Sequence, residues 1–400
     1  MTNEVKNVPE LRFPEFDEEW EKKRLKDICK INPKFEDNFP SEFNYIDLES
    51  VKKGKIYKIS KYTMHNAPSR AQRVAKQGDI FFQTVRPYQQ NNFVFVDDSY
   101  PTVVSTGYAQ LRSNLNPSYL YNLLLTTSFL NKVLVKCTGS NYPAINSSDL
   151  SNIQLKVTSN IDEQQKIGEF FSELDRQIEL EEQKLEKLEE QKKGYMQKIF
   201  SQEIRFKDDN GNDYPNWENE KLGNLINEVN ERTTSNNQYV LLSSTKSGLL
   251  SQEEYFKKQI GSKDSTGYKI LRLNQLVLSP QNLWLGNINF NQRFNIGIVS
   301  PSYRIYNLSH QFDINFAKDL LKSPRYIYEY AQASEQGASV VRRNLNLELF
   351  YSIKISLPSI EEQRKIGAFL DKLDKLIRKQ YNKIEVLKQR KKGLLQKMFI

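Results

Sequence analysis

The sequence has few of the residues from which metal sites and nucleophilic active sites are built. It contains two cysteines, Cys29 and Cys137, and two histidines, His65 and His310, among 400 residues. A structural zinc site needs about four such ligands close together, and no Gly-x-Ser-x-Gly segment offers a serine nucleophile. We therefore expect no metal site, two unpaired thiols in a reducing compartment, and ordinary structural roles for both histidines.

Long apolar runs and nucleotide-binding motifs are also missing. No run approaches the roughly 18 apolar residues that a membrane span needs, and the opening MTNEVK lacks the apolar core of a secretion signal. The sequence contains neither a Gly-x4-Gly-Lys-Ser/Thr phosphate loop nor the Asn-Pro-Pro-Tyr motif of adenine methylation. These absences predict a cytoplasmic, non-catalytic chain.

Basic residues outnumber acidic residues by 58 to 49, which gives a net charge of +9. Residues 360–400 carry a net charge of +7, whereas residues 161–200 carry −4. A mild basic excess is compatible with nucleic-acid binding but is also common in proteins that never bind nucleic acid. The 38% hydrophobic content is enough for two or three domains with cores of their own.

A segment of 40 residues occurs twice, 199 positions apart. Residues 161–200 and 360–399 are identical at 19 of 40 positions without a gap. Both copies open with Ile-x-Glu-Gln-x-Lys-Ile-Gly and close with Lys-Lys-Gly-x-x-Gln-Lys-x-Phe. The long segments beside them share only short matches, such as Leu11–Phe13 with Ile204–Phe206. The sequence therefore predicts one scaffold that is used twice and carries two different surfaces.

The repeat is circular. The segment that follows the first copy corresponds to the beginning of the chain, and the second copy ends at the last residues, where this counterpart would continue. We therefore expect the two ends of the chain to meet. The two repeated segments should then run antiparallel, related by a pseudo-two-fold axis.

Both copies have the apolar spacing of a coiled coil, with steps that alternate between four and three residues. Asn160 with Glu163, and Ser359 with Glu362, form the start of a helix-capping box before each copy. The predicted seam consists of Ile167, Phe171, Leu174, Ile178, Leu185 and Leu188 in the first helix, and Ile366, Leu370, Leu373, Ile377, Ile384 and Leu387 in the second. Polar residues interrupt the seam at matching positions, Glu181 and Lys192 against Gln380 and Lys391.

The opposite charges of the two helices favour pairing with each other. A register in which paired residue numbers sum to about 561 places Glu181 opposite Gln380. The same register makes two glycine pairs face each other, which would allow close backbone approach: Gly168 with Gly393, and Gly194 with Gly367. Forty helical residues extend about 60 Å, so such a pair could act as a ruler between the heads.

The segments beside the helices indicate mixed α/β heads. Short β-rich runs are expected at 44–48, 79–83, 93–96, 276–279 and 297–300, and helices at 119–133 and 316–333. The fold class predicted for the whole chain is mixed α/β, with two globular heads separated by two long antiparallel coiled-coil helices. The expected domains are head 1 (1–160), a central spacer helix (161–200), head 2 (201–359) and a distal spacer helix (360–400).

Several predicted loops combine basic, amide and aromatic side chains, which suit DNA. Arginine can bond guanine with two hydrogen bonds, asparagine and glutamine can do so with adenine, and lysine and serine suit phosphates. The candidates in head 1 are Lys52, Lys53, Lys55, Arg70, Arg73, Gln83, Arg86, Tyr88, Asn91, Ser140, Asn141 and Tyr142. The candidates in head 2 are Lys246, Lys263, Gln281, Asn282, Trp284, Asn287, Arg342 and Arg343.

Two variable segments that alternate with two copies of this helix motif resemble the specificity subunit of type I restriction–modification systems, over essentially the whole chain. The resemblance implies that each head is a target recognition domain for one half of a split, asymmetric DNA site. It implies that the helices set the gap between the half-sites and dock two modification (methyltransferase) subunits, which restriction subunits join. S-adenosylmethionine would then bind the modification subunit, ATP and Mg²⁺ the restriction subunit, and no cofactor this chain.

Two alternatives remain open at this point. One is the specificity subunit of a related split-site system with a fused methyltransferase–nuclease partner. The other, from a different class, is a coiled-coil scaffold that joins two protein-binding heads. The scaffold alternative predicts no salt-dependent affinity for DNA, whereas DNA binding should weaken steeply as salt is added.

Overall fold

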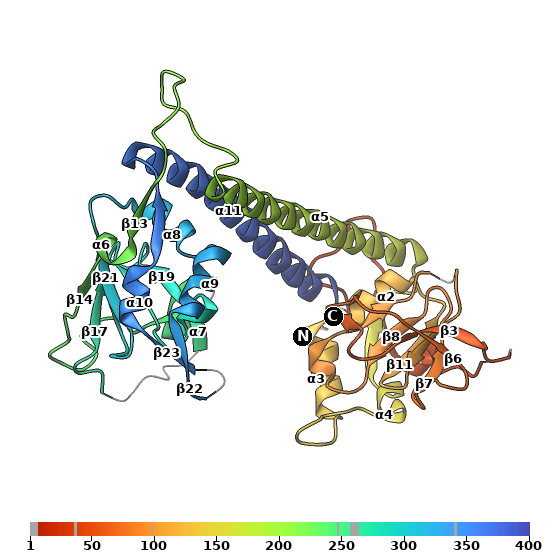
Figure 1. The fold of residues 1–400 in the computed structure, drawn as a ribbon. Helices are drawn as coiled ribbons and strands as arrows, with labels where there is room; N and C mark the ends of the chain where they lie inside the picture. The colour runs from red at the N-terminus through yellow and green to blue at the C-terminus, as the bar shows by residue number, and fades with distance from the viewer. Residues whose placement is uncertain (1–6, 36–37, 98, 246–247, 257–263, 340–341) are drawn as a thin grey trace, which may run out of the picture. The chain divides into compact units, whose positions relative to one another are not determined.

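The computed structural model describes residues 7–400 except 36–37, 98, 246–247, 257–263 and 340–341. The chain divides into two compact units (Figure 1). Unit 1 comprises Met1–Gln183 and Tyr381–Ile400, and unit 2 comprises Lys184–Gln380. Each unit contains one mixed α/β head together with one half of each of two long helices.

The long helices are α5 (Ile161–Phe200) and α11 (Ile360–Met398). The Asn160 side chain accepts a hydrogen bond from the Glu163 backbone N–H at 3.1 Å, and the Ser359 hydroxyl accepts one from Glu362 N–H at 3.3 Å. Both helices therefore begin at the predicted caps. The two glutamates do not complete the capping box in the expected way, because their carboxylates bind arginines instead.

The two helices run antiparallel within each unit. In unit 1, Asp175 pairs with Lys391 at 2.6 Å and Glu182 with Lys388 at 2.8 Å. In unit 2, Lys192 pairs with Asp374 at 2.6 Å. Asp175 and Asp374 are equivalent residues of the two repeats, 199 positions apart, and so are Lys192 and Lys391. The same ion pair therefore occurs once in each unit. The lysines that interrupt the predicted seam thus carry the pseudo-two-fold ion pairs between the helices.

All twelve predicted seam residues are buried or half-buried, but several of them pack against a head as well as a helix. Ile167, Phe171 and Leu174 belong to the hydrophobic core of head 1, and Ile366 and Leu370 belong to that of head 2. The others are buried at Ile178 and Ile384 and half-buried at Leu185, Leu188, Leu373, Ile377 and Leu387. The helix ends are therefore parts of the heads.

The predicted glycine pairs are wrong. Inside the units, the ion pairs and the contact of Tyr195 with Phe369, whose ring centroids lie 5.1 Å apart, join residues whose numbers sum to 564–566. A Cβ placed on Gly194 or Gly393 would meet no described atom within 4 Å. Glu181 and Gln380 belong to different units, so their pairing stays a prediction.

The other two glycines allow a head helix to approach the long helix. A Cβ on Gly168 would lie 2.6 Å from the Asn116 side chain and 3.1 Å from the Tyr119 backbone N, at the start of α2 (Pro117–Leu124). A Cβ on Gly367 would lie 2.9 Å from the Phe316 backbone N, in α8 (Ile314–Leu320). The repeated glycine is thus required by contact between helix and head, not by contact between the two long helices.

The remaining residues of the repeated motif also attach helix to head. Glu163 is fully buried and accepts two hydrogen bonds from Arg12, at 2.6 and 2.8 Å. Glu362, also fully buried, binds Arg205 in the same way, with a shortest distance of 2.6 Å. The next residue, Gln164, accepts a hydrogen bond from the backbone N–H of the α2 N-cap, Asn116. Gln363 does the same for the α8 N-cap, Asp313.

Among its described residues, head 1 has two four-stranded sheets and two smaller pairs of strands, β1-β12 and β4-β5. The sheet orders are β2-β11-β8-β9 and β6-β3-β10-β7, and β1 pairs with β12. The bounds are β1 (Glu21–Arg24), α1 (Leu25–Ile28), β2 (Cys29–Ile31), β3 (Glu42–Ile46), β4 (Val51–Lys52), β5 (Lys55–Ile56), β6 (Ser60–Thr63), β7 (Ala71–Val74), β8 (Ile80–Gln83), η1 (Pro87–Gln89), β9 (Phe93–Val94), β10 (Thr102–Ser105), β11 (Tyr108–Ser113), α2, α3 (Thr127–Val135), α4 (Ser147–Ser151) and β12 (Gln154–Val157).

Head 2 repeats part of this plan, with shorter strand pairs in place of the second four-stranded sheet. Its sheet β14-β21-β18-β19 and the pair β13-β24 match β2-β11-β8-β9 and β1-β12 of head 1. The bounds are β13 (Glu218–Lys221), α6 (Leu222–Leu225), β14 (Ile226–Val229), β15 (Leu242–Thr245), β16 (Gly248–Ser251), α7 (Gln252–Phe256), β17 (Lys269–Arg272), β18 (Leu276–Leu278), η2 (Leu283–Leu285), β19 (Ile288–Phe290), β20 (Ile296–Val299), β21 (Arg304–Leu308), α8, α9 (Pro324–Gln332), β22 (Ser334–Ser339), β23 (Arg342–Leu345), α10 (Leu347–Ser352) and β24 (Lys354–Leu357).

Each of the two helical stretches predicted in the heads is two helices. In head 1 the break lies at Thr126, whose hydroxyl caps α3 by accepting the Phe129 backbone N–H at 3.2 Å. In head 2 it lies before Pro324, the first residue of α9, because proline has no N–H to continue the helix. Periodicity alone does not reveal such a break, since both helices present an apolar face to one core.

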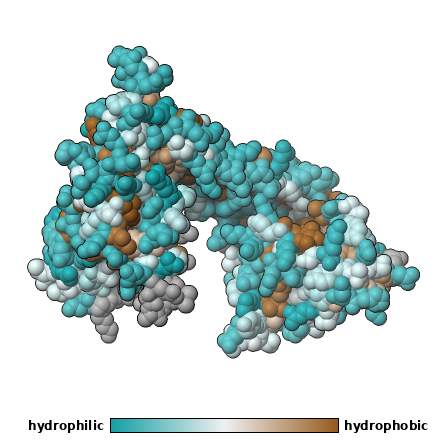
Figure 2. Space-filling model, in the orientation of Figure 1, coloured by the Kyte–Doolittle hydropathy of each residue, from teal (hydrophilic) through white to brown (hydrophobic). Residues whose placement is uncertain are grey.

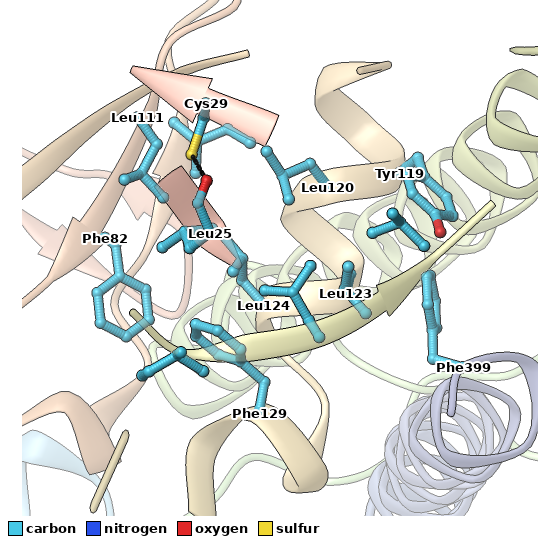
Figure 3. Close-up of a cluster of buried hydrophobic side chains, with 14 of the residues drawn as sticks. Leu25, Cys29, Phe82, Leu111, Tyr119, Leu120, Leu123, Leu124, Phe129 and Phe399 are labelled. Atoms are coloured by element: carbon cyan, nitrogen blue, oxygen red, sulfur yellow. Dashed lines mark hydrogen bonds between the residues drawn. The ribbon is translucent and has the colours of Figure 1, made fainter. Parts of the chain in front are cut away.

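The core of head 1 includes residues from both long helices. Figure 3 shows Leu120, Leu123 and Leu124 of α2 with Phe129 of α3 in this core, and Phe399, just after α11, beside Tyr119. The Cys29 thiol lies in the same core and donates to the Leu25 carbonyl at 3.1 Å, and burial raises its pKa to about 12. Cys29 and Cys137 are both free, as predicted.

The two ends of the chain meet in unit 1, as the circular repeat predicts (Figure 1). Leu11 N–H donates to the Lys397 carbonyl at 2.8 Å, and Ile204 N–H donates to the Lys198 carbonyl at 3.1 Å in unit 2. The first contact joins the chain's beginning to its end, and the second is formed within continuous chain. Within the described residues, no helix has the length and apolar character to cross a membrane.

Candidate nucleic-acid interface

The two heads share a connector that begins where a central strand ends. In head 1 the connector joins β8 to β9 through η1, and in head 2 it joins β18 to β19 through η2. Each 3-10 turn ends at a left-handed residue, Gln90 with φ 50° and Gly286 with φ 83°. The turns η1 and η2 thus lie at equivalent places in the two heads, but their sequences, PYQ and LWL, are unrelated.

In head 1 this connector meets the loop between α3 and α4. Arg86, itself left-handed with φ 54°, places its guanidinium carbon 4.3 Å from the ring centre of Tyr142. The Arg86 backbone N–H donates to the Pro143 carbonyl at 2.7 Å, which joins the two loops. Tyr142 is 65% exposed and Tyr88 is 50% exposed. An arginine and an exposed tyrosine are therefore in contact, and a second exposed tyrosine lies on the same connector.

Head 2 has the same kind of pair with the partners exchanged. The aromatic residue, Trp284, lies on the connector, and the arginine, Arg343, lies on the β22–β23 hairpin that precedes α10. The Arg343 guanidinium carbon lies 4.4 Å from the Trp284 ring centre, and its backbone N–H donates to the Gln281 carbonyl at 3.3 Å. An arginine–aromatic contact of this kind contributes about 0.5–2 kcal/mol and restricts the orientation of both side chains.

Two of the predicted contact residues are buried and hold the connectors in shape. Gln83 is 2% exposed, donates to the Gln89 side chain at 2.9 Å and accepts the Asn91 backbone N–H at 3.1 Å. Asn287 is 7% exposed and exchanges two hydrogen bonds with Ser244, at 2.6 and 2.9 Å. The side-chain amides of Gln83 and Asn287 bind neighbouring parts of the chain, so we no longer count these two residues as candidate base contacts.

The three lysines of the β4–β5 hairpin differ in their surroundings. Lys52 and Lys53 are exposed, and the Lys53 backbone N–H donates to the Asn91 side chain at 2.9 Å. Lys55 is held by two carboxylates of α5, Glu179 at 3.1 Å and Glu182 at 3.5 Å. The hairpin therefore adjoins the end of the η1 connector, while Lys55 belongs to the contact between head and helix.

The other candidates show a range of exposure. Arg70, Ser140, Asn141 and Gln281 are exposed, and Asn282 is half-buried. Arg73 is half-buried on β7, and burial lowers the pKa of its guanidinium. Lys246 and Lys263 lie outside the described residues, and of Arg342 only the backbone, in β23, is described.

This arrangement suits binding. No group of three or more His, Cys, Asp or Glu residues that could hold a metal ion occurs among the described residues. Hydrophilic residues dominate the visible surface of the long helices (Figure 2). Sequence reasoning did not single out Tyr57, Lys58 and Lys61, which are all exposed beside the predicted lysines. The signal for them was a long run of sequence without any carboxylate.

The family model for the type I restriction modification DNA specificity domain matches the chain twice, over residues 17–190 and 196–388. Each match covers one head and most of the helix that follows it. The chain belongs to this family of DNA specificity proteins.

Two curated relatives carry names of the same kind, and one solved structure shares the fold. The HindI specificity subunit of Haemophilus influenzae is 29% identical over 182 residues, which span 43% of this chain and 39% of the relative's length. The putative MjaX specificity subunit of Methanocaldococcus jannaschii is 24% identical over 97% of this chain and 95% of its own. The S subunit of a type I restriction-modification system from M. genitalium is 16% identical, with a TM-score of 0.56 over 98% of this chain and 99% of that one.

Proposed function

We propose that this chain is the sequence-reading, non-catalytic subunit of a type I restriction–modification enzyme. Head 1 (1–160) and head 2 (201–359) each read one half of a split, asymmetric DNA site. The spacer helices (161–200 and 360–400) set the gap between the half-sites. DNA is the substrate of the whole enzyme, so we place the chain in the cytoplasm.

The observation that carries this proposal is that a repeated scaffold carries a different surface in each head. One four-stranded sheet and one strand pair have the same order in the two heads, whereas the connectors after β8 and β18 carry different side chains. In both heads an arginine lies against an aromatic ring where the connector meets a neighbouring loop. The arginine lies on the connector in head 1 and on the neighbouring hairpin in head 2. Arginine is the usual partner of guanine in the major groove. Two different readers on one scaffold are what an asymmetric site requires.

The partners follow from the family and from the helices. We propose that two modification subunits dock on the helix pair, one for each unit, and that restriction subunits join them. S-adenosylmethionine would be bound by the modification subunit, and ATP and Mg²⁺ by the restriction subunit. In this proposal the present chain recognises the DNA sequence, and the other subunits catalyse the reactions.

The proposal is tested by mapping methylated adenines in a methylation-free bacterial host that expresses this chain with its modification subunit. We expect one motif with two short specified parts and a constant unspecified gap. Arg86→Ala should relax the first part only, and Arg343→Ala the second part only, because each good bidentate contact contributes about 1–3 kcal/mol of base discrimination.

Two outcomes would contradict the proposal. Methylation without this chain would remove its role in recognition, and relaxation of both parts by either variant would remove independent reading. Incubation of the pure chain with labelled methyl donor and DNA provides the control for catalysis. We expect no transfer of label to DNA in that control.

A further inference from the structure

Head 1 contains a long stretch of sequence without a single carboxylate. Between Glu49 and Asp79 there are eight basic residues in 29 positions and no acidic residue. The equivalent part of head 2, residues 242–272, has six basic and three acidic residues. The two heads therefore differ strongly in local charge, although they share one scaffold.

Four lysines of this stretch are exposed: Lys52, Lys53, Lys58 and Lys61. Among the residues that the structure describes, no carboxylate lies within 4.0 Å of their ammonium groups. Lys55, in the same stretch, is the exception, since Glu179 and Glu182 bind it. Lys52, Lys53 and Lys58 thus face solvent with no described carboxylate within 4.0 Å, and the Lys61 ammonium lies 5.5 Å from the ring centre of Tyr100.

Large apolar side chains are exposed between these lysines and just after them. Tyr57 is 68% exposed, Ile59 is 53% exposed and Met64 is 57% exposed. Single exposed apolar residues are common, but three of them within eight positions of a lysine-rich segment are a feature of a binding surface. We call residues 52–64 the basic arm of head 1.

The basic arm has a fixed attachment beside the connector that carries Arg86 and Tyr88. Its hairpin is anchored by the hydrogen bond from Lys53 N–H to the Asn91 side chain, at 2.9 Å. Gly54 has φ +78°, and a Cβ there would lie 2.4 Å from the Tyr121 hydroxyl oxygen, so the hairpin packs directly on α2. The arm is therefore held in a constant position relative to the proposed base-reading residues of the same head.

We infer that the basic arm binds the phosphate backbone of double-stranded DNA, and that head 1 supplies more of the sequence-independent affinity than head 2. This inference rests on the proposed function. Lysines that contact phosphates release counterions from DNA, which gives binding a steep salt dependence without sequence preference. Exposed tyrosine, isoleucine and methionine side chains suit contact with sugars and base edges of a groove.

The test measures the affinity of the full chain, in complex with its modification subunit, for a fluorescent 40-bp duplex of random sequence between 50 and 250 mM NaCl. The arm variant carries K52Q, K53Q, K58Q and K61Q. The matched control carries K22Q, K26Q, K30Q and K136Q, four exposed lysines elsewhere in head 1. Each lost phosphate contact reduces the slope of log K against log salt by about 0.9.

We expect the arm variant to lose two to four units of slope and to bind more than tenfold more weakly at 100 mM NaCl, by this rule. The control variant should lose less than one unit, and K55Q alone less than half a unit, because Lys55 already has carboxylate partners. Replacement of the same four arm lysines by arginine should restore the slope, which separates loss of charge from loss of folding.

The outcomes separate this inference from the proposed function. If the unaltered complex shows no salt-dependent affinity for DNA, the proposed function itself fails. If it binds DNA steeply but the arm and control variants lose the same slope, the basic arm has no special role and the inference is overturned.

Discussion

At the scale of single residues, one buried glutamate connects each long helix to a head. Glu163 and Glu362 are fully buried, and each binds the arginine of a Leu/Ile-Arg-Phe segment. Removing one partner of a buried ion pair costs about 3–5 kcal/mol, because the remaining charge stays buried without compensation. These pairs explain why the motif repeats at both places where a helix meets a head.

We predict that Arg12→Met lowers the free energy of unfolding of unit 1 by about 3 kcal/mol, and that Arg205→Met does so for unit 2. Circular dichroism during urea unfolding measures both effects. Lys23→Met is the matched control, because Lys23 and its partner Glu21 are both more than 40% exposed and should contribute less than about 1 kcal/mol. Equal losses in the control and the Arg12 variant would contradict this role for the motif.

The sequence revealed which residues repeat, but it did not reveal what each of them contacts. Gly168 and Gly367 looked like helix–helix contacts because both lie in a coiled-coil pattern, and they instead accommodate α2 and α8. Gln83 looked like a base reader because it follows a strand, and it is buried in its own loop. Spacing along a chain records repetition and exposure patterns, whereas contacts between distant segments depend on tertiary packing.

At the scale of elements, the helix pair is held by an ion pair that occurs once in each unit. In unit 1, Lys391 is 14% exposed and lies 2.6 Å from Asp175. In unit 2, Lys192 is 15% exposed and binds both Asp374 and Asp319, the latter in α8. Burial raises the pKa of Asp319, while the neighbouring lysine opposes that rise. The unit 2 contact therefore ties the helix pair to head 2 as well.

We predict that Asp175→Lys or Lys391→Asp alone destabilises unit 1 by about 1–2 kcal/mol, and that the double exchange recovers most of this loss. The reason is that each single change opposes like charges at a partly buried site, and the exchange restores attraction. Thermal unfolding of the four proteins gives the coupling energy. Glu173 and Arg176, an exposed pair within α5, provide the control exchange with little coupling. A double variant as unstable as the sum of the singles would contradict antiparallel pairing here.

The heads show what sequence patterns can predict about elements. The β-rich runs at 44–48, 79–83, 93–96, 276–279 and 297–300 all contain strands, because alternating or continuous apolar residues mark buried strands well. The connectors η1 and η2 could not be matched from sequence, since their side chains differ and their common feature is a left-handed backbone position. The two connectors share a backbone conformation, although their side chains differ.

At the scale of the whole molecule, the boundary between the units crosses both long helices at their middles. It falls after Gln183 in α5 and after Gln380 in α11. An insertion at both points leaves the contacts inside each unit unchanged. The helix pair can thus be lengthened without altering either head, which makes its proposed role as a ruler testable.

We predict that seven residues inserted after Gln183 and seven after Gln380 lengthen the gap of the recognised site by about three base pairs. Seven helical residues add about 10 Å, and one base pair extends 3.4 Å. Adenine methylation mapping with the modification subunit measures the gap. An insertion in α5 alone should abolish methylation because it breaks the pairing of the helices, and an unchanged gap in the double insertion would exclude the ruler.

The central claim is that two independent DNA readers are mounted on one antiparallel, circularly repeated scaffold. The most direct measurement replaces residues 218–357 with a second copy of residues 21–157, since these segments begin and end in the matching strand pairs β13–β24 and β1–β12. Methylation mapping of this chain should show the first half-site twice, as an inverted repeat separated by a constant gap. A direct repeat, or retention of the original second half-site, would contradict the account.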